Sequence, residues 1–141
     1  MSGERIYHIV AQADFRAHSD GRSYLPGDFV AGGFVHCALE VSVLSVANDY
    51  YSGVSDTLLL LRIDPAKLTS PTRYVAADPA GGAAAAGGAG DSHLATSAVF
   101  PHVYGPIDLA AIDGVGVLTK GGGGYEWPAA FLALAEVEGR T

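Results

Sequence analysis

A run of four consecutive leucines at residues 58–61 constrains the fold more than any other part of the sequence. The apolar segment around it covers residues 57–63 and ends at Asp64 and Pro65, a capping residue followed by a proline suited to the first position of a helical turn. An apolar segment of this length without polar alternation is typical of a strand that is buried on both faces. Residues 57–63 therefore predict the central strand of a sheet.

Several other short segments favour strands, and few favour helices. The predicted strands cover residues 5–10, 34–38, 73–75, 102–105 and 114–118. A glycine run at 121–124 predicts a hairpin that leads into residues 125–128. Many short strands with few helices favour an α+β fold over a doubly wound parallel sheet. The length of 141 residues fits a single domain over residues 1–141.

Helical spacing is confined to residues 11–18 and to a segment that begins at Glu40 and ends near Gly53. Residues 131–137 fit either an amphipathic helix or an additional edge strand. Residues 77–92 form an Ala/Gly tract without periodicity, which predicts a flexible surface insertion.

The charge balance and the single cysteine narrow the classes of partner and compartment. The net charge is −7 and the eight basic residues are scattered, so we expect no nucleic-acid partner and favour a small organic molecule. No apolar stretch reaches the roughly 18 residues of a membrane span, and the N-terminus has no signal-peptide pattern. We therefore expect a cytoplasmic protein with no membrane partner, in which Cys37 is a packed thiol. The oligomeric state is left open.

Three histidines, His8, His36 and His102, lie inside short apolar strand-like segments. Because side chains alternate across a strand, each imidazole shares a face with apolar neighbours. A buried polar group left without a partner costs on the order of 1 to 3 kcal/mol, so each imidazole needs a hydrogen-bond partner, a ligand or a metal. Three separately satisfied core histidines are one explanation, and a shared ligand site is another.

The chain resembles a small bacterial family known as domain of unknown function 952. The most specific strings are Gly-Phe-Val-His-Cys at residues 33–37 and Phe-Pro-His-Val-Tyr-Gly at residues 100–105. Further matching strings lie in order along the chain at residues 6–9, 46–51 and 58–64. The resemblance implies a core over about residues 5–128, with the 77–92 insertion and a variable tail at 129–141 outside the usual pattern.

That family is similar in fold to the ADP-ribosyltransferase group, which implies a curved, split β core with short helices that holds NAD in a cleft. Tyr7-His8 resembles a first-strand motif whose histidine bonds a ribose hydroxyl, and Phe34 and Tyr50 lie in segments that resemble the group's second motif. His102 stands in the strand where that group carries its catalytic glutamate. A neutral imidazole cannot supply the field of a carboxylate, so the standard ADP-ribosyl transfer is not favoured.

We therefore expect a small-ligand-binding protein or enzyme with a histidine-lined cleft, and NAD or another nucleotide is a candidate ligand. If the protein is an enzyme, it is transferase-like or an acid/base enzyme, since imidazole titrates near pH 6.5. The candidate catalytic residues are His36, His102 and Tyr104. The candidate cofactor contacts are His8, Phe34, Tyr24, Tyr50 and Tyr51, with Tyr24 expected on a loop.

Two other function classes stay open. Three converging imidazoles from His8, His36 and His102 would match the ligand set of a catalytic zinc, although the sequence contains no His-x-His spacing and we assign no residue to a metal. A non-catalytic binding module whose histidines only shape a pocket is the third class.

Overall fold

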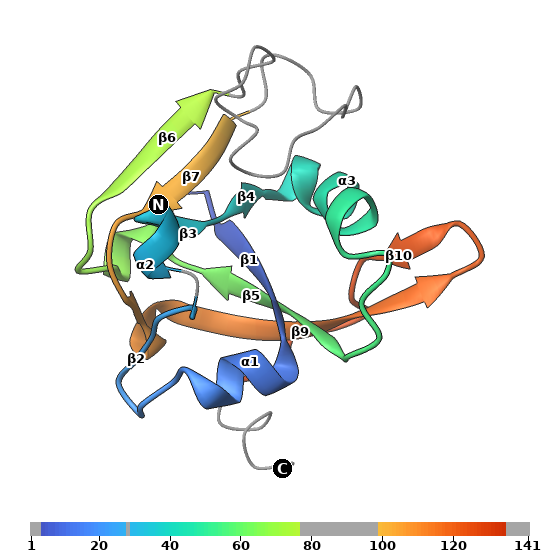
Figure 1. The fold of residues 1–141 in the computed structure, drawn as a ribbon, viewed down its shortest axis with the longest axis horizontal. Coiled ribbons are helices and arrows are strands. Elements are labelled where there is room, and N and C mark those ends of the chain that lie inside the picture. The colour runs from blue at the N-terminus through green and yellow to red at the C-terminus, as the bar shows by residue number, and fades with distance from the viewer. Residues whose placement is uncertain (1–3, 28, 77–98, 135–141) are drawn as a thin grey trace.

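The largest sheet has five antiparallel strands in the order β10-β9-β5-β1-β4 (Figure 1). The structure, a computed structural model, describes residues 4–27, 29–76 and 99–134. The strands are β1 (Ile6–Ala11), β4 (Ala38–Leu39), β5 (Leu58–Ile63), β9 (Ile112–Gly121) and β10 (Gly124–Glu126). The strand predicted at residues 57–63 is β5, and its central place in the sheet is confirmed. Leu59 and Leu61 pack into one apolar cluster and Leu58 and Leu60 into a second, so both faces of β5 are buried.

A second antiparallel sheet has the order β3-β7-β6, and a two-stranded ribbon pairs β2 with β8. These strands are β3 (Val35–His36), β6 (Thr72–Ala76), β7 (Val99–Val103), β2 (Ser23–Tyr24) and β8 (Ile107–Asp108). The helices are α1 (Gln12–Ala17), α2 (Phe29–Gly32) and α3 (Glu40–Tyr50), with short 3-10 turns at Pro65–Lys67 and Leu109–Ala111. The expectation of a single α+β domain with a curved β core and short helices is confirmed, and the strands of the core pair antiparallel.

The strand expected at residues 34–38 is divided in the structure. β3 pairs with β7, whereas β4 pairs with β1, so the chain passes from the small sheet to the large one at Cys37. The backbone N–H of Cys37 donates to the carbonyl of Pro101 at 3.0 Å. Burial raises the pKa of the Cys37 thiol, which keeps it protonated. This agrees with the prediction of a packed thiol.

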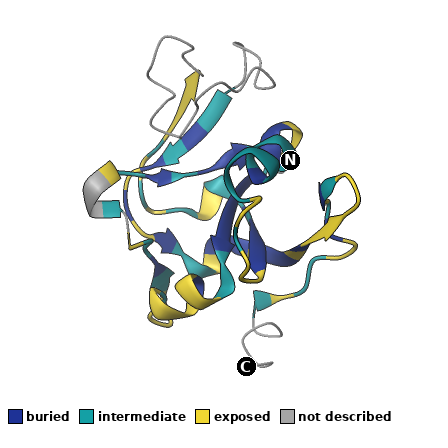
Figure 2. Ribbon diagram, turned by 45° about the vertical axis from the view of Figure 1, so that its right-hand side comes forward, coloured by how far each residue is buried: buried dark blue, intermediate teal, exposed yellow. Residues whose placement is uncertain are grey.

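The small sheet has one buried face. Val35 of β3 and Val103 of β7 are paired in register, and both are buried in the larger apolar cluster. The next pair along the same two strands, His36 and His102, therefore lies on the opposite face of the sheet. β6 is mostly exposed, in contrast to the buried central strands (Figure 2).

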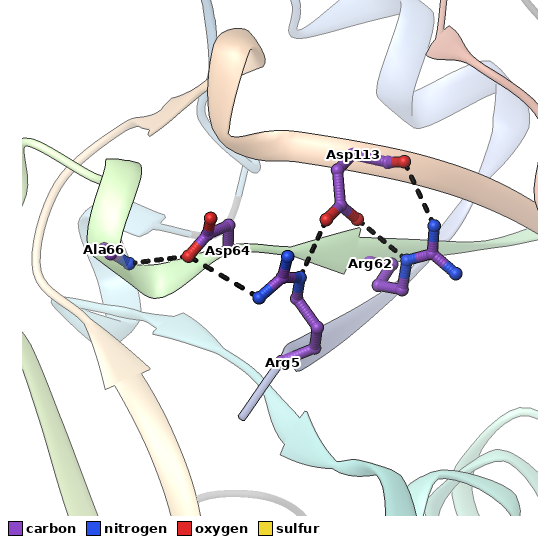
Figure 3. Close-up of polar contacts among 5 residues, drawn as sticks. All are labelled: Arg5, Arg62, Asp64, Ala66 and Asp113. Carbon is purple, nitrogen blue, oxygen red and sulfur yellow. Dashed lines mark hydrogen bonds and ion pairs between the residues drawn. The ribbon is translucent and has the colours of Figure 1, made fainter. Parts of the chain in front are cut away.

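An ion-pair cluster joins the ends of three central strands (Figure 3). The Asp113 carboxylate accepts a hydrogen bond from Arg5 Nε at 2.7 Å and another from Arg62 Nε at 2.8 Å. Arg5 also lies 3.7 Å from the Asp64 carboxylate. Burial alone would raise the pKa of the Asp113 carboxyl, but the two arginine hydrogen bonds outweigh it, so this pKa lies below its usual value. These contacts tie β1, β5 and β9 together.

The segment after β10 lies along β9. Leu132 forms an isolated antiparallel bridge with Val115, which is an edge-strand contact, although residues 135–141 lie outside the described part of the chain. A side chain at Gly116 would place its Cβ 2.6 Å from Pro128, so glycine permits this close approach. The insertion predicted at 77–92 also lies outside the described residues. No described helix has both the length and the apolar character that crossing a membrane requires.

Candidate functional site

The structure brings four of the predicted site residues together on the exposed side of the small sheet. His36 of β3 and His102 of β7 are directly opposite each other in the antiparallel register. Phe34 precedes β3 and Tyr104 follows β7. We refer to Phe34, His36, His102 and Tyr104 as the aromatic–imidazole face. The backbone N–H of Tyr104 donates to the Pro71 carbonyl at 2.8 Å, which fixes the chain just after β7.

Phe34 lies at the centre of this face. Its ring stacks on the imidazole of His102, with 3.8 Å between the ring centroids and 11° between the planes. The His36 ring lies edge-on to Phe34 at 4.5 Å, and the Tyr104 ring lies 5.6 Å from it. The two imidazole centroids are 5.9 Å apart. Phe34, His36 and His102 are half-buried, and Tyr104 is 38% exposed, so a solute can reach the face.

The protonation of His102 is set by this packing. Burial lowers the pKa of the His102 imidazole because the charged form loses hydration, and the nearby His36 lowers it further. His102 is therefore mainly neutral at pH 7. Neither of its ring nitrogens has a hydrogen-bond partner among the residues that the structure describes. A neutral imidazole in this state has one donor and one acceptor available to a ligand.

His8 lies beneath the face and is in a different situation. It is only 8% exposed, and its Nδ1 lies 2.6 Å from the carbonyl oxygen of His36, while its Nε2 lies 3.0 Å from the Tyr24 hydroxyl. A carbonyl oxygen only accepts, so Nδ1 carries the proton and donates to it. In the neutral ring Nε2 then accepts from Tyr24. Both nitrogens of the residue predicted to contact a ribose are thus used inside the protein.

Tyr24 was expected on a loop, and that prediction is wrong. It pairs with Ile107 as part of the β2–β8 ribbon, and it is 1% exposed. Its ring packs against Phe15 at 5.1 Å and against His8 at 5.5 Å. The sequence signal was a nearby Pro-Gly pair, which marks a turn but does not show which flanking residue the fold buries. As placed, Tyr24 supports His8 from the core.

Tyr50 and Tyr51 lie at the end of α3. Tyr50 is the last residue of the helix, and Tyr51 is its C-terminal cap. The carbonyl of Tyr51 accepts a hydrogen bond from the Tyr125 hydroxyl at 2.9 Å. The side chain of Tyr51 packs against the apolar cluster that contains Leu58 and Leu60. These contacts connect α3 with β10, so this tyrosine pair belongs to the large-sheet side of the fold.

The arrangement also contains a residue that the sequence analysis did not select. Arg73 of β6 is directly opposite His102 of β7 in the register. Directly opposite residues of antiparallel strands project from the same face, so Arg73, His102 and His36 form a row across three strands. The sequence predicted the strand at residues 73–75, but only the pairing register shows which residue faces which.

A three-histidine metal site is not formed. Within the described residues, no group of three histidine, cysteine, aspartate or glutamate side chains is placed to hold a metal ion. The physical reason is the position of His8, whose nitrogens are directed to His36 and Tyr24 and not toward the other two imidazoles. Apolar strand context alone did not show that His8 and His102 lie in different layers.

The comparisons with known proteins concern family and fold. The family model described as "Protein of unknown function (DUF952)" matches residues 9–115, which confirms the resemblance drawn from the sequence strings. No curated protein matches the chain. The chain is similar to the crystal structure of protein CC0527 from Caulobacter crescentus, with a TM-score of 0.65 and 19% identity, over 86% of this chain and 93% of that chain.

The solution NMR structure of the same Caulobacter protein has a TM-score of 0.54 and 22% identity, over 86% of this chain and 90% of that chain. At such identities the similarity shows a common fold. Neither structure is described as an ADP-ribosyltransferase, so that part of the sequence resemblance stays a prediction.

Proposed function

Because the chain belongs to the DUF952 family, whose function is unknown, we propose a function from the geometry of its own site. The aromatic–imidazole face binds a small planar molecule, and the imidazole of His102 exchanges a proton with that molecule. The face offers aromatic surface from Phe34 and Tyr104 and a hydrogen-bonding edge from His102. A nucleotide such as NAD is one candidate of this class.

The observation that carries this proposal is the state of His102. Its imidazole is half-buried and stacked on Phe34, its pKa is lowered, and its ring nitrogens lack a described partner. A histidine needed only for stability normally has a hydrogen-bond partner, as His8 does. An imidazole with an available nitrogen and a pKa below neutrality suits a general base.

The chemistry divides among the residues of the face. The neutral His102 takes a proton from a hydroxyl or another acidic group of the bound molecule and returns it in a later step. Tyr104 supplies a hydroxyl that can donate a hydrogen bond to the same molecule. His36 lies close enough to His102 to disfavour its protonation, which keeps His102 in the form that accepts a proton.

His8 acts in this proposal as a positioning residue. Its Nδ1 proton is donated to the carbonyl of His36, so it holds the backbone of β3 in place. Since His102 stands where the resembling transferases carry glutamate, the proposal does not include the standard ADP-ribosyl transfer.

The proposal is tested by following the imidazole signals of labelled protein by NMR during titration with NAD, ADP-ribose, nicotinamide and a common thiol. We expect at least one of them to shift the His36 and His102 signals together and to raise the thermal midpoint, because a ligand that binds the folded state stabilises it. Both effects should be lost in His102→Ala.

His18→Ala is the matched control, because His18 is an exposed histidine on another part of the surface with its Nδ1 2.9 Å from the Asp14 carbonyl. This variant should retain the ligand response. Binding that survives unchanged in His102→Ala and in Phe34→Leu would overturn the assignment to this face. If binding depends on His102 but does not change between about pH 5 and 8, the face binds the molecule without exchanging a proton, and the proton-exchange part of the proposal is wrong.

A further inference from the structure

We propose that Arg73 makes the aromatic–imidazole face selective for planar molecules that carry an anionic group, either a carboxylate or a phosphate. This inference rests on the proposed function, since it names the class of molecule that the same face accepts.

The register of the small sheet places the cationic Arg73 beside His102, the proposed acid/base group. His36 pairs with His102 across β3 and β7, and His102 pairs with Arg73 across β7 and β6. Residues directly opposite in antiparallel strands have Cβ atoms about 4.5 to 5.5 Å apart. The base of the Arg73 side chain is therefore one strand spacing from His102 on the same face. A single small molecule can span that interval.

Arg73 differs from the arginines that the fold uses for stability. Arg5 and Arg62 are both paired with the Asp113 carboxylate. Arg73 is exposed, and it has no ion pair with any residue in the described ranges 4–27, 29–76 and 99–134. Within these ranges no carboxylate competes with a solute for the guanidinium of Arg73.

The amino-acid composition of the small sheet is a second, independent observation in favour of an anionic ligand. The chain contains 15 acidic residues and has a net charge of −7, yet β3, β6 and β7 contain no aspartate or glutamate. Burial and, to a smaller extent, the nearby carboxylate of Glu4 raise the pKa of the Tyr74 hydroxyl. Tyr74 is the neighbour of Arg73 on β6, so its side chain projects from the other face of the sheet. A face with one cation and no strand carboxylate, in an acidic protein, favours anions locally.

The chemistry of the two groups defines the ligand class. A guanidinium binds carboxylate or phosphate through two parallel N–H donors, which gives orientation as well as attraction. The rings of the face contribute stacking to a planar group. A molecule held at both points presents its polar edge to His102. The structure therefore points to an aromatic or heteroaromatic acid or to a nucleoside phosphate.

Two pairs of ligands distinguish the effect of the ligand's charge on binding from the effect of its planar shape. Nicotinate and nicotinamide share one ring and differ in a carboxylate, and AMP and adenosine share one base and differ in a phosphate. We would measure their dissociation constants from the shift of the His102 imidazole signal at pH 7 and low salt. In the wild-type protein we expect the anionic member of at least one pair to bind about tenfold or more tightly than the neutral member. The pair that shows this preference identifies the anion as carboxylate or phosphate.

The variants assign that preference to a residue. Arg73→Ala should weaken binding of the anionic probe about tenfold and leave the neutral probe within about twofold, since Arg73 is exposed and has no ion pair among the described residues. Arg73→Lys should restore part of the preference, because charge is kept and the two-pronged geometry is lost. Arg16→Ala, a change of an exposed arginine on α1, is the control and should have no effect.

The outcomes separate this inference from the proposed function. If both members of each pair bind equally and His102→Ala abolishes the ligand-induced shift of the His36 signal, the face binds planar molecules and the role of Arg73 is overturned. A preference for the anion that persists in Arg73→Ala overturns it as well. If no probe shifts the His102 signal up to about 10 mM, where even contacts worth about 3 kcal/mol would register, both proposals are wrong for these ligand classes.

Discussion

His8 and His102 are both histidines between apolar neighbours on short strands, and they are in opposite physical situations. The imidazole of His8 is buried, and both of its nitrogens are bonded to other parts of the fold. The imidazole of His102 is half-buried, is stacked on Phe34 and has no described hydrogen-bond partner. The contrast shows that the number of internal partners, and not the surrounding sequence pattern, separates a structural histidine from one that is available to a ligand.

The largest effect is expected from His8→Ala. The change removes a buried ring and leaves the His36 carbonyl and the Tyr24 hydroxyl without this partner, so we expect a loss of about 3 kcal/mol in the free energy of unfolding. Urea denaturation followed by fluorescence measures this loss. His18→Ala, on an exposed histidine, should cost less than about 0.5 kcal/mol. A cost below about 1 kcal/mol for His8→Ala would show that His8 is not a structural histidine.

A smaller effect is expected from Tyr24→Phe. This change keeps the buried ring and removes the hydroxyl that donates to His8 Nε2, which should cost about 1 to 2 kcal/mol. The double variant with His8→Ala should cost less than the sum of the single changes, since both remove the same hydrogen bond. Strictly additive costs in denaturation curves would show that the bond between these side chains contributes nothing to stability.

The smallest effect on stability is expected from His102→Ala, below about 1 kcal/mol at pH 7, because no described hydrogen bond is lost. Its pH dependence is the sharper test. Burial and, to a smaller extent, the nearby His36 lower the pKa of His102 in the folded state, where Arg73 lies opposite it in the register. The unfolded chain therefore binds the proton more readily. The stability that this group contributes is therefore present above its unfolded pKa of about 6.5 and falls as the pH drops toward the folded value.

Denaturation of the wild-type protein and His102→Ala at pH 7.5 and at pH 5.5 measures this contribution. The wild-type protein should lose more stability on acidification than the variant does. Equal losses in the two proteins would mean that the surroundings of His102 do not disfavour its charged form, which would contradict this prediction.

Local pattern was sufficient for the central strand of the fold and insufficient for the pairing of the other strands. The apolar run at residues 57–63 predicted the buried central strand because a strand without alternation must be covered on both faces. The division at Cys37 was missed because each half of that segment follows a different partner strand, and neither partner is near in sequence. Pairing register is a property of the whole sheet.

The same limit applies to the site. The strings around His36 and His102 pointed to residues that the fold brings together. The positions of His8 below the face and of Arg73 beside it depend on contacts between distant strands, which spacing along the chain does not encode. The sequence therefore indicated which residues to consider, whereas the position of each side chain required the geometry.

The junction at Cys37 also has a consequence for biosynthesis. β1 and β5 both precede residue 64, so the buried centre of the large sheet can begin to pair while the chain is still being made. The aromatic–imidazole face cannot, because the strand β7 that carries His102 is synthesised much later and must close a long loop back onto β3. A nascent or truncated chain that ends before β7 holds His8 and His36 without the second imidazole. Any reactivity of this face is thus withheld until β7 has been synthesised.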